Sequence, residues 1–534
     1  MTRALIITGG VVAALIAGPA FAGDRHKSIT PYIEIGQVLT EDFSNSDVLT
    51  YSTVAAGVDA SIQTRRTQLQ VSYRYERRFS WNKKVADDDV HSGLARAAVK
   101  VAPGFSIEGG ALATRSRADV RGAAPGVLAG NVDNVSQVYS AYVGPTLSTH
   151  AGPASVGASY RFGYTKVEAP TATGVSPTAP KLDRFDNSHS QVAQATVGVK
   201  AGAVLPVGMT ASAAWQRDDA SQLDQRYDGK YARGDVVLPV VPTLALTAGA
   251  GYEKITVSQR DPQLDVGGNP VTDARGRFVT DKSSPRRIAY QTDGLIYDAG
   301  VIWRPSARTS LQVRVGRRYG GTTYTGSFSY APTHSIGMQV GVYDSVDTFG
   351  HQLEEGIANL PTSFIEQRDA FGQQFSGCTY GAGGAGAGGC LNGVFQSIST
   401  SAYRARGVDA VISAHRGGLS FGVGAGYANR RFYAPGTSTG FTVNGISDQS
   451  FYVDGFMNAA LTHRSGISAN VFGNYYESGI AGASAVTSVG ATGLYYLNFG
   501  RLGTSASVGV YSFSQQGASD QVSGTAQLGM RYQF

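Results

Sequence analysis

The chain ends on Gly524-Thr-Ala-Gln-Leu-Gly-Met-Arg-Tyr-Gln-Phe534, and this stretch decides the fold. Every second residue from Ala526 to Phe534 is apolar, and the residues between them are polar or glycine. A period of two predicts a β-strand with one apolar and one polar face. The aromatic carboxy-terminus lies on the apolar face, although the terminal residues of soluble domains usually fray in water. The suffix therefore predicts a final strand whose apolar face contacts lipid.

Outer-membrane β-barrels end on a strand of this kind, which their assembly machinery recognises. We interpret Leu528, Met530, Tyr532 and Phe534 as that assembly signal, with Phe534 at the periplasmic rim. The expected partners are outer-membrane lipid, lipopolysaccharide and the barrel-assembly machinery. The last strand is expected to pair with the first, near Tyr32 to Leu39, which closes the barrel.

The amino-terminus has the form of a secretory signal peptide. Arg3 precedes an apolar run, and Ala20-Phe21-Ala22 is a small-x-small cleavage site. We expect residues 1–22 to be removed after Ala22. No later run of about 18 apolar residues predicts a membrane helix. These features together predict a bacterial outer-membrane location.

The stretch Thr67 to Trp81 is the clearest internal strand. Its apolar and polar residues alternate over fifteen positions, which at about 3.3 Å each reach about 50 Å. Strands of soluble proteins usually have five or six residues. About 22 segments (range 18–22) follow this pattern, with short and long connections in alternation. An even number of strands leaves both termini in the periplasm.

The sequence thus predicts an all-β fold, a transmembrane antiparallel up-and-down β-barrel over residues 23–534. The alternative is a soluble propeller or a chain of sandwiches, but their strands would be shorter and a blade repeat would show recurring residues. The 69 glycines and 28 tyrosines suit tight turns and interfacial aromatic belts. The first strand begins within about ten residues of the cleavage site, so no N-terminal plug domain is expected, unlike in plugged transporters.

Residues 348–399 form the longest segment without alternation. A helix is expected after Pro361, because Phe364, Ile365, Arg368 and Phe371 follow helical spacing. In an exported chain, Cys378 and Cys390 predict a disulfide rather than a metal site. Two interpretations stay open for this segment. It is either an exposed, stapled external loop, or it folds into the mouth or lumen and narrows the pore.

Charged side chains on the inward parity of the strands form the second candidate site. Such charges can set ion selectivity, and Arg and Lys favour anions. The simpler interpretation is that they pair with one another and keep the lumen wet. The inward-facing set is Arg74, Glu76, Arg78, Arg96, Lys100, Arg161, Asp298, Arg314 and Arg318.

No enzyme motif is visible. The eight histidines are scattered, without a His-x-x-x-His pair or a nucleophile elbow, so no catalytic, cofactor-binding or metal-binding residues are expected. The net charge of +6 is spread along alternating strands rather than gathered on a basic helix, so nucleic acid is not expected as a partner.

The stretch Trp303-Arg-Pro-Ser-Ala-Arg-Thr-Ser-Leu311, with Arg317-Arg-Tyr-Gly-Gly-Thr-Thr-Tyr324 after it, resembles uncharacterised outer-membrane barrel proteins of the exosortase (PEP-CTERM) and exopolysaccharide type. That resemblance implies a role around surface polysaccharide or envelope export, and no catalytic residues. The expected function is a porin-like channel for polar solutes, with anionic solutes and oligosaccharides as candidate substrates. The alternative is a non-conducting structural or assembly barrel of an exopolysaccharide or envelope export system. The sequence leaves the oligomeric state open.

Overall fold

The computed structural model describes residues 26–43, 47–81, 88–119, 134–170, 173, 175, 181–368, 371, 375–381, 387–395, 398–436, 442–480, 482–516 and 520–534. The expected signal peptide lies outside these described residues. The expectations of cleavage after Ala22 and of no N-terminal plug concern that region and stay predictions.

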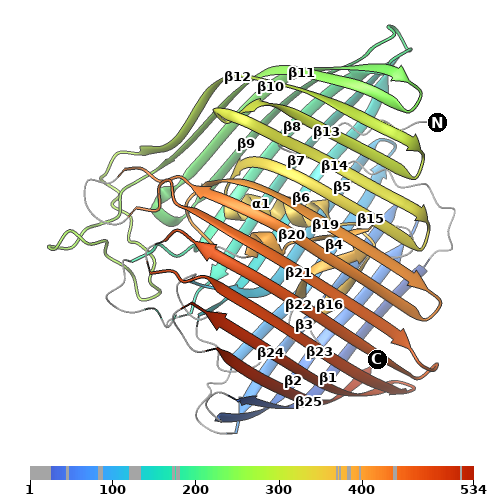
Figure 1. The fold of residues 1–534 in the computed structure, drawn as a ribbon, viewed down its shortest axis with the longest axis vertical. Coiled ribbons are helices and arrows are strands. Elements are labelled where there is room, and N and C mark those ends of the chain that lie inside the picture. The colour runs from blue at the N-terminus through green and yellow to red at the C-terminus, as the bar shows by residue number, and fades with distance from the viewer. Residues whose placement is uncertain are drawn as a thin grey trace.

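Twenty-two strands form a single antiparallel sheet (Figure 1). Each strand pairs with its neighbours along the chain, and β15 continues to β19. The predicted number of strands is confirmed. The strands of the barrel are β1 (His26–Asp42), β2 (Asp47–Gln63), β3 (Thr67–Ser80), β4 (Asp88–Ala102), β5 (Phe105–Arg117), β6 (Val135–Ala151), β7 (Ala154–Glu168), β8 (Asn187–Val199), β9 (Gly208–Ala220), β10 (Arg226–Val241), β11 (Leu244–Gln259), β12 (Arg287–Ser306), β13 (Thr309–Arg318), β14 (Gly321–Thr333), β15 (Ile336–Asp347), β19 (Tyr403–Arg416), β20 (Leu419–Phe432), β21 (Ser447–Ala460), β22 (Ser465–Ser478), β23 (Val486–Phe499), β24 (Leu502–Gln515) and β25 (Gln521–Gln533).

The first and last strands close the ring. Tyr32 lies opposite Gln533 and Leu39 opposite Ala526, in the register expected from the sequence. Closure leaves the sheet without a free edge, so each strand has hydrogen-bonding partners on both sides.

Connections differ in length at the two ends of the barrel. At one end two-residue turns such as Pro103-Gly104 and Gly152-Pro153 join the strands, with the glycines at φ +76° and +59°, where other residues are strained. The opposite end carries long connections, including residues 260–286 and 433–446 (Figure 1). Short turns mark the periplasmic end of such barrels, and the carboxy-terminus lies there.

Alternation along the strands separates an apolar outer surface from a polar inner one. In β25, Leu528 and Met530 are 69% and 44% exposed, whereas Thr525 and Gln527 are 4% and 5% exposed. The barrel strands span 10 to 20 residues each. A closed sheet of this length with an apolar exterior is a transmembrane barrel, and the chain belongs in the bacterial outer membrane.

The long connection between β15 and β19 has its own secondary structure. It contains α1 (Phe349–Asn359), β16 (Phe364–Arg368), β17 (Phe375–Gly381), β18 (Gly388–Cys390) and α2 (Asn392–Phe395), and the three strands form a small sheet. The short 3-10 helix η1 (Gln222–Asp224) lies between β9 and β10. No helix among the described residues is long and apolar enough to cross a membrane.

The helix expected after Pro361 is wrong. Residues 364–368 are a strand, and the helix lies before the proline. Thr348 caps its start, and Leu360 is extended at φ −67°, ψ 147°, as the residue before a proline prefers. The helical spacing of Phe364, Ile365, Arg368 and Phe371 is coincidental, because Phe364–Arg368 pairs with β17 instead.

Candidate functional site

Residues 348–402, here called the insert, connect two strands that already pair with each other. Asp347 at the end of β15 lies opposite Tyr403 at the start of β19. From this point the insert enters the barrel, where α1 contacts β5 to β8 and the small sheet contacts β19 and β20. Thr362 Oγ1 donates to Gln68 Oε1 at 2.6 Å, beside the short turn between β2 and β3. The insert therefore runs from the long-loop end toward the periplasmic end.

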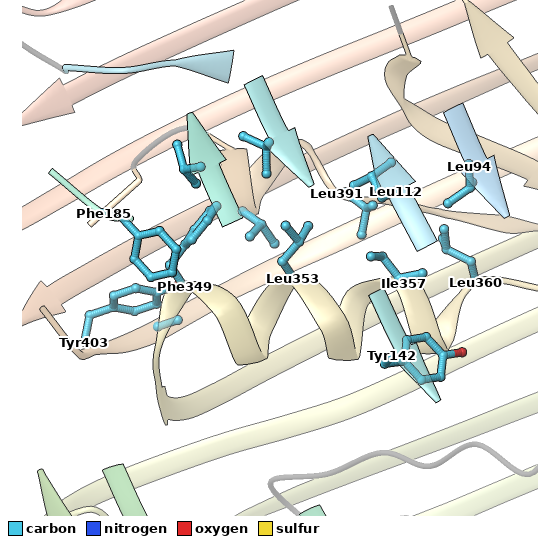
Figure 2. Close-up of a cluster of buried hydrophobic side chains, with 14 of the residues drawn as sticks. Leu94, Leu112, Tyr142, Phe185, Phe349, Leu353, Ile357, Leu360, Leu391 and Tyr403 are labelled. Atoms are coloured by element: carbon cyan, nitrogen blue, oxygen red, sulfur yellow. The ribbon is translucent and has the colours of Figure 1, made fainter. Parts of the chain in front are cut away.

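An apolar stripe holds α1 against the inner wall. Phe349, Leu353 and Ile357 are four residues apart, lie on one helix face and have no exposed surface. Figure 2 shows these side chains directed at the strands. Burying each such side chain contributes about 1.5–3 kcal/mol, so α1 is held by a folded core. The wall side of this core includes Leu94, Leu112, Val138, Tyr142 and Val167.

A polar network holds the start of α1. Asp347 Oδ1 accepts hydrogen bonds from Thr348 N at 2.9 Å and from His351 Nδ1 at 2.7 Å. The Thr348 hydroxyl donates to Asp218 of β9 and accepts from His351 N at 3.4 Å. None of these four residues is more than 7% exposed. The point where the chain leaves the barrel wall is thus fixed by buried hydrogen bonds.

Glu354, one turn further along α1, continues this network. The Ser190 hydroxyl of β8 donates to Glu354, and Thr165 Oγ1 of β7 donates at 3.2 Å. A Cβ at Gly163 would collide with the Glu354 carboxyl, so the glycine makes room for it. Glu354 is 1% exposed and has hydroxyl rather than cationic partners.

Burial raises the pKa of Glu354 to about 8, and the nearby Asp218 acts in the same direction. For His351, burial disfavours the charged ring, but the adjacent Asp347 carboxylate outweighs it and raises the pKa to about 9. At neutral pH the network therefore holds a protonated Glu354 and a charged His351.

A metal ion is a poor match for this network. Ligand atoms of Asp347, His351 and Glu355 lie within 4.8 Å of one another. However, Asp347 Oδ1 already accepts from two close N–H groups, and Gln216 Nε2 lies 3.5 Å away. Asp347 Oδ1 is therefore already paired with the His351 ring and is not free to bind a metal ion.

Cys378 and Cys390 form a disulfide across the paired strands β17 and β18. Cys378 has no exposed surface and packs with Val411 and Tyr452 of the wall. A Cβ at Gly424 would collide with Cys390 Sγ, so a glycine in β20 allows the disulfide to approach. The disulfide thus secures the insert's sheet where it meets β19 to β21.

Several of the inward-facing charges expected from the sequence form ion pairs. Arg74 contacts Glu34 at 3.0 Å and Glu76 at 2.5 Å, and Arg78 contacts Glu76 at 2.8 Å. Arg74, Glu76 and Arg78 are at most 3% exposed. These side chains form a buried ladder along β3, whose charges largely cancel.

A second cluster joins β10, β12 and β13. Arg314 contacts Asp235 at 2.7 Å and Asp298 at 3.0 Å, and Arg233 contacts Asp298 at 2.9 Å. Arg318 pairs with Glu253 of β11. Arg233, Asp235 and Glu253 are not among the inward-facing charges expected from the sequence. The alternation along each strand could have shown that these three side chains point inward. It could not have shown that their partners lie two strands away.

The remaining predicted cations line the wall from β4 to β7. Arg96 donates to the carbonyls of Ala358 at 2.8 Å and Leu360 at 3.2 Å, and so caps the end of α1. Arg161 lies over the Tyr142 ring at 5.0 Å, and Lys100 is exposed. Among the described residues neither Arg161 nor Lys100 has a carboxylate within ion-pair distance. A role of these residues in ion selectivity stays a prediction.

No known protein family matches the sequence, and no curated protein matches it. Among solved structures, the siderophore receptor PiuA from Acinetobacter baumannii has a TM-score of 0.43 at 9% identity, covering 94% of this chain and 82% of that one. The FrpB iron transporter from Neisseria meningitidis (F5-1 variant) has a TM-score of 0.42 at 10% identity, covering 95% and 82%. The ferric-catecholate import receptor Fiu from E. coli K12, in its open form, has a TM-score of 0.40 at 9% identity, covering 94% and 81%. At this level of similarity, what those proteins bind does not transfer to this chain.

We expect docking of α1 to weaken as pH rises. The pKa of Glu354 is about 8 when docked against 4.5 in water, so its contribution is complete below pH 4.5 and is lost by about pH 8. His351, at about 9 against 6.5, extends the loss toward pH 9. Glu354→Gln should remove the part of this pH dependence that lies between pH 4.5 and pH 8. Protection factors of the α1 amides from hydrogen exchange, measured between pH 4 and 9, would show it.

Glu355→Gln is the matched control, because it makes the same change on the same helix at a residue that is less buried. Because Glu355 helps to raise the pKa of His351, the slopes are compared below pH 6.5, where His351 is charged in the docked and the undocked helix alike. In that range this variant should keep the wild-type slope. An unchanged slope in Glu354→Gln would contradict the assigned role of Glu354.

The β3 ladder yields a stability prediction. Glu76→Ala removes the carboxylate shared by Arg74 and Arg78, and should lower the unfolding free energy by about 3 kcal/mol. Arg77, at the outer end of β3, pairs with the half-exposed Asp89 of β4. Asp89→Ala removes this partner and should lower the unfolding free energy by less than about 1 kcal/mol. Urea unfolding in detergent micelles would measure both values, and equal losses would refute the distinction.

Proposed function

We propose that the chain is an outer-membrane channel for polar solutes that the insert holds closed. The observation that carries this proposal is that the described residues of the insert lie within a ring of 22 strands whose own pairing does not need them. A barrel of this strand number without a filling leaves a wide lumen. The polar inner face seen at Thr525 and Gln527 is that of a wall able to contact water.

Oligosaccharides and other polar solutes of the envelope are the proposed substrates, in keeping with the resemblance to exopolysaccharide-associated barrels. The proposal includes assembly through the terminal strand, in which Leu528, Met530, Tyr532 and Phe534 act as the recognition signal. The partners in that role are the assembly machinery, lipid and lipopolysaccharide.

A second candidate is a non-conducting barrel that anchors an envelope or exopolysaccharide export complex. The observation in its favour is the completeness of the core between α1 and the wall. Phe349, Leu353 and Ile357 are fully buried there, as in the interior of a stable domain. A permanently docked insert would fill the lumen as a structural element, and solutes would have no path through the barrel.

Conductance in planar bilayers separates the two candidates. Because Asp347 and Tyr403 are already paired, residues 348–402 can be replaced by an Asn-Gly turn without moving either strand. The channel proposal expects the shortened protein to conduct at least about tenfold more current than the wild type, since the lumen of such a barrel is wide. Heat-modifiable migration on gels would verify that the shortened barrel is folded.

A tethered variant provides the control. Ile357 touches the wall beside Gly110, so cysteines at these positions should cross-link α1 to β5. The cross-linked protein should stay closed and open on reduction, whereas wild type treated with reductant controls for the native disulfide. A folded, insert-free barrel that remains silent would exclude the channel and favour the anchoring role.

The insert-free channel should show a weak preference for anions. Arg74, Arg78, Arg314 and Arg318 are paired with carboxylates, whereas Lys100 and Arg161 are not, and Arg96 loses its carbonyl partners when the insert is removed. The reversal potential in a potassium chloride gradient should therefore have the sign for chloride. The triple variant Arg96→Met, Lys100→Met, Arg161→Met should bring it close to zero, and a cation preference in the unsubstituted channel would overturn this prediction.

A further inference from the structure

A cavity of about 390 Å³ lies between the long loops of the barrel and the end of the insert. It is lined by residues 181–184, by the loop between β11 and β12, by residues 432–443 where described, and by residues 398–401 of the insert. Cavities of about 300–1,000 Å³ with apolar walls and a few polar groups are typical of sites for small molecules. The packing of α1 and the disulfide do not account for this space.

The cavity borders the apolar core that holds α1. Phe432 is 2% exposed, lines the cavity and belongs to that core. Ile398 of the insert also lines the cavity and packs against the same core. Phe185 follows the lining segment 181–184 and packs edge-to-face on Phe349, with 5.2 Å between the ring centroids (Figure 2). A molecule in the cavity therefore contacts the core that fixes the insert.

Much of the remaining wall is apolar as well. Leu223 and Ile480 line the cavity at 5% and 8% exposed, as does Phe278. Leu223 has a left-handed backbone, at φ +50° and ψ 24°, which is uncommon for residues other than glycine. Its carbonyl accepts a hydrogen bond from Arg260 N at 2.7 Å, which holds this conformation. Backbone strain of this kind is often found at ligand sites.

Two polar side chains of the lining are available to a ligand. Gln259 at the end of β11 and Ser401 of the insert are both partly exposed. Neither side chain forms a hydrogen bond with another residue that the structure describes. A ligand with a hydroxyl or carbonyl group can therefore form a hydrogen bond here without displacing a partner inside the protein.

Charged side chains of the lining already have partners within the protein. An ionic ligand would have to displace these partners or leave its own charge poorly solvated, so the cavity favours an uncharged molecule. The partners are Pro270 O at 3.3 Å for Lys181, the carbonyls of Pro170 and Arg275 for Arg184, Asp261 at 2.9 Å for Arg287, and Ser283 Oγ at 2.6 Å for Asp281.

We propose that this cavity binds a small, uncharged and mainly apolar molecule with one or two hydrogen-bonding groups, and that the bound molecule stabilises the docked insert. Ile398 and Ser401 belong to the insert, so undocking removes one wall of the site. A ligand that binds only the docked form stabilises that form by mass action. Such an effector differs from the polar solutes proposed above, and its binding does not depend on whether the lumen conducts.

The purified full chain in determined detergent micelles, titrated with 2-naphthol at neutral pH against protein-free micelles, tests the site. This probe has a flat apolar ring and one hydroxyl group, and it should bind saturably. Naphthalene-2-sulfonate has the same rings with a charge, and maltose is uncharged but polar on all sides. Both should bind at least about tenfold more weakly, because the cavity offers them neither a free cation nor a polar wall.

Two variants locate the site. Val443→Trp fills part of the cavity with a larger side chain, and Leu264→Asp places a charge on its exposed edge. Each should weaken 2-naphthol binding at least about tenfold. Val266→Asp is the matched control for the second variant, because Val266 lies two residues further along the same loop, is fully exposed and does not line the cavity. It should bind as the wild type does.

Hydrogen exchange tests the effect on the insert. With 2-naphthol at about 100 times its Kd, the α1 amides should exchange about 100-fold more slowly, provided that they exchange by undocking. The site is refuted if 2-naphthol does not bind saturably, if the sulfonate or maltose binds best, or if Val443→Trp and Leu264→Asp both bind like the wild type. Binding that leaves the exchange of the α1 amides unchanged would refute the stabilisation of the insert.

Discussion

Backbone hydrogen bonding in a medium without water is the constraint on which the rest of this structure depends. An unpaired N–H or C=O in hydrocarbon costs several kcal/mol, so the strands have to form a ring. The pairing of Tyr32 with Gln533 and of Leu39 with Ala526 completes that ring. Once the sheet is closed, the period of two assigns every side chain to lipid or to the interior. The interior becomes polar by necessity and too wide to pack upon itself, so it has to be filled by water or by another part of the chain.

The insert meets this polar interior in two ways. Where α1 docks, the inner face of the wall is apolar, and Leu94, Leu112 and Val138 form a core with the helix. Elsewhere charged side chains of the wall form ion pairs with one another, as Arg314 does with Asp235 and Asp298. Buried ion pairs of this kind add little net stability but are costly to break, because the remaining partner would stay charged and desolvated. The wall is thus divided into a docking region and a self-paired region.

Features that depend on local periodicity could be predicted from the sequence. Contacts that depend on the register between strands could not. Strand number and the closing pair followed from alternation and from the terminal strand. The helix was misplaced because residues 364–371 imitate helical spacing, while α1 contains Gly350 and Gly356, which lower helix propensity. The inward parity of Arg74 was readable, but its contact with Glu34, 40 residues earlier, depends on the alignment of three strands. Apolar residues on the inward parity, such as Leu94 and Val138, were the unused indication that the lumen contains protein.

The attachment of the insert makes its stability separable from that of the barrel. Both of its ends leave the ring at one point, where Asp347 faces Tyr403, so movement of the insert requires no change in strand pairing. The disulfide reduces the freedom of the undocked segment, which lowers the entropy lost on docking. The contacts that hold the insert include the apolar stripe of α1, the hydrogen bonds around Asp347 and Glu354, those of Arg96 to the end of the helix, and the packing of the small sheet on β19 and β21. Undocking of the insert would therefore draw on a local free energy smaller than that of global unfolding, because the strand ladder contributes nothing to it. On the proposed function, the pairing of Asp347 with Tyr403 would keep the ring closed while the insert undocks.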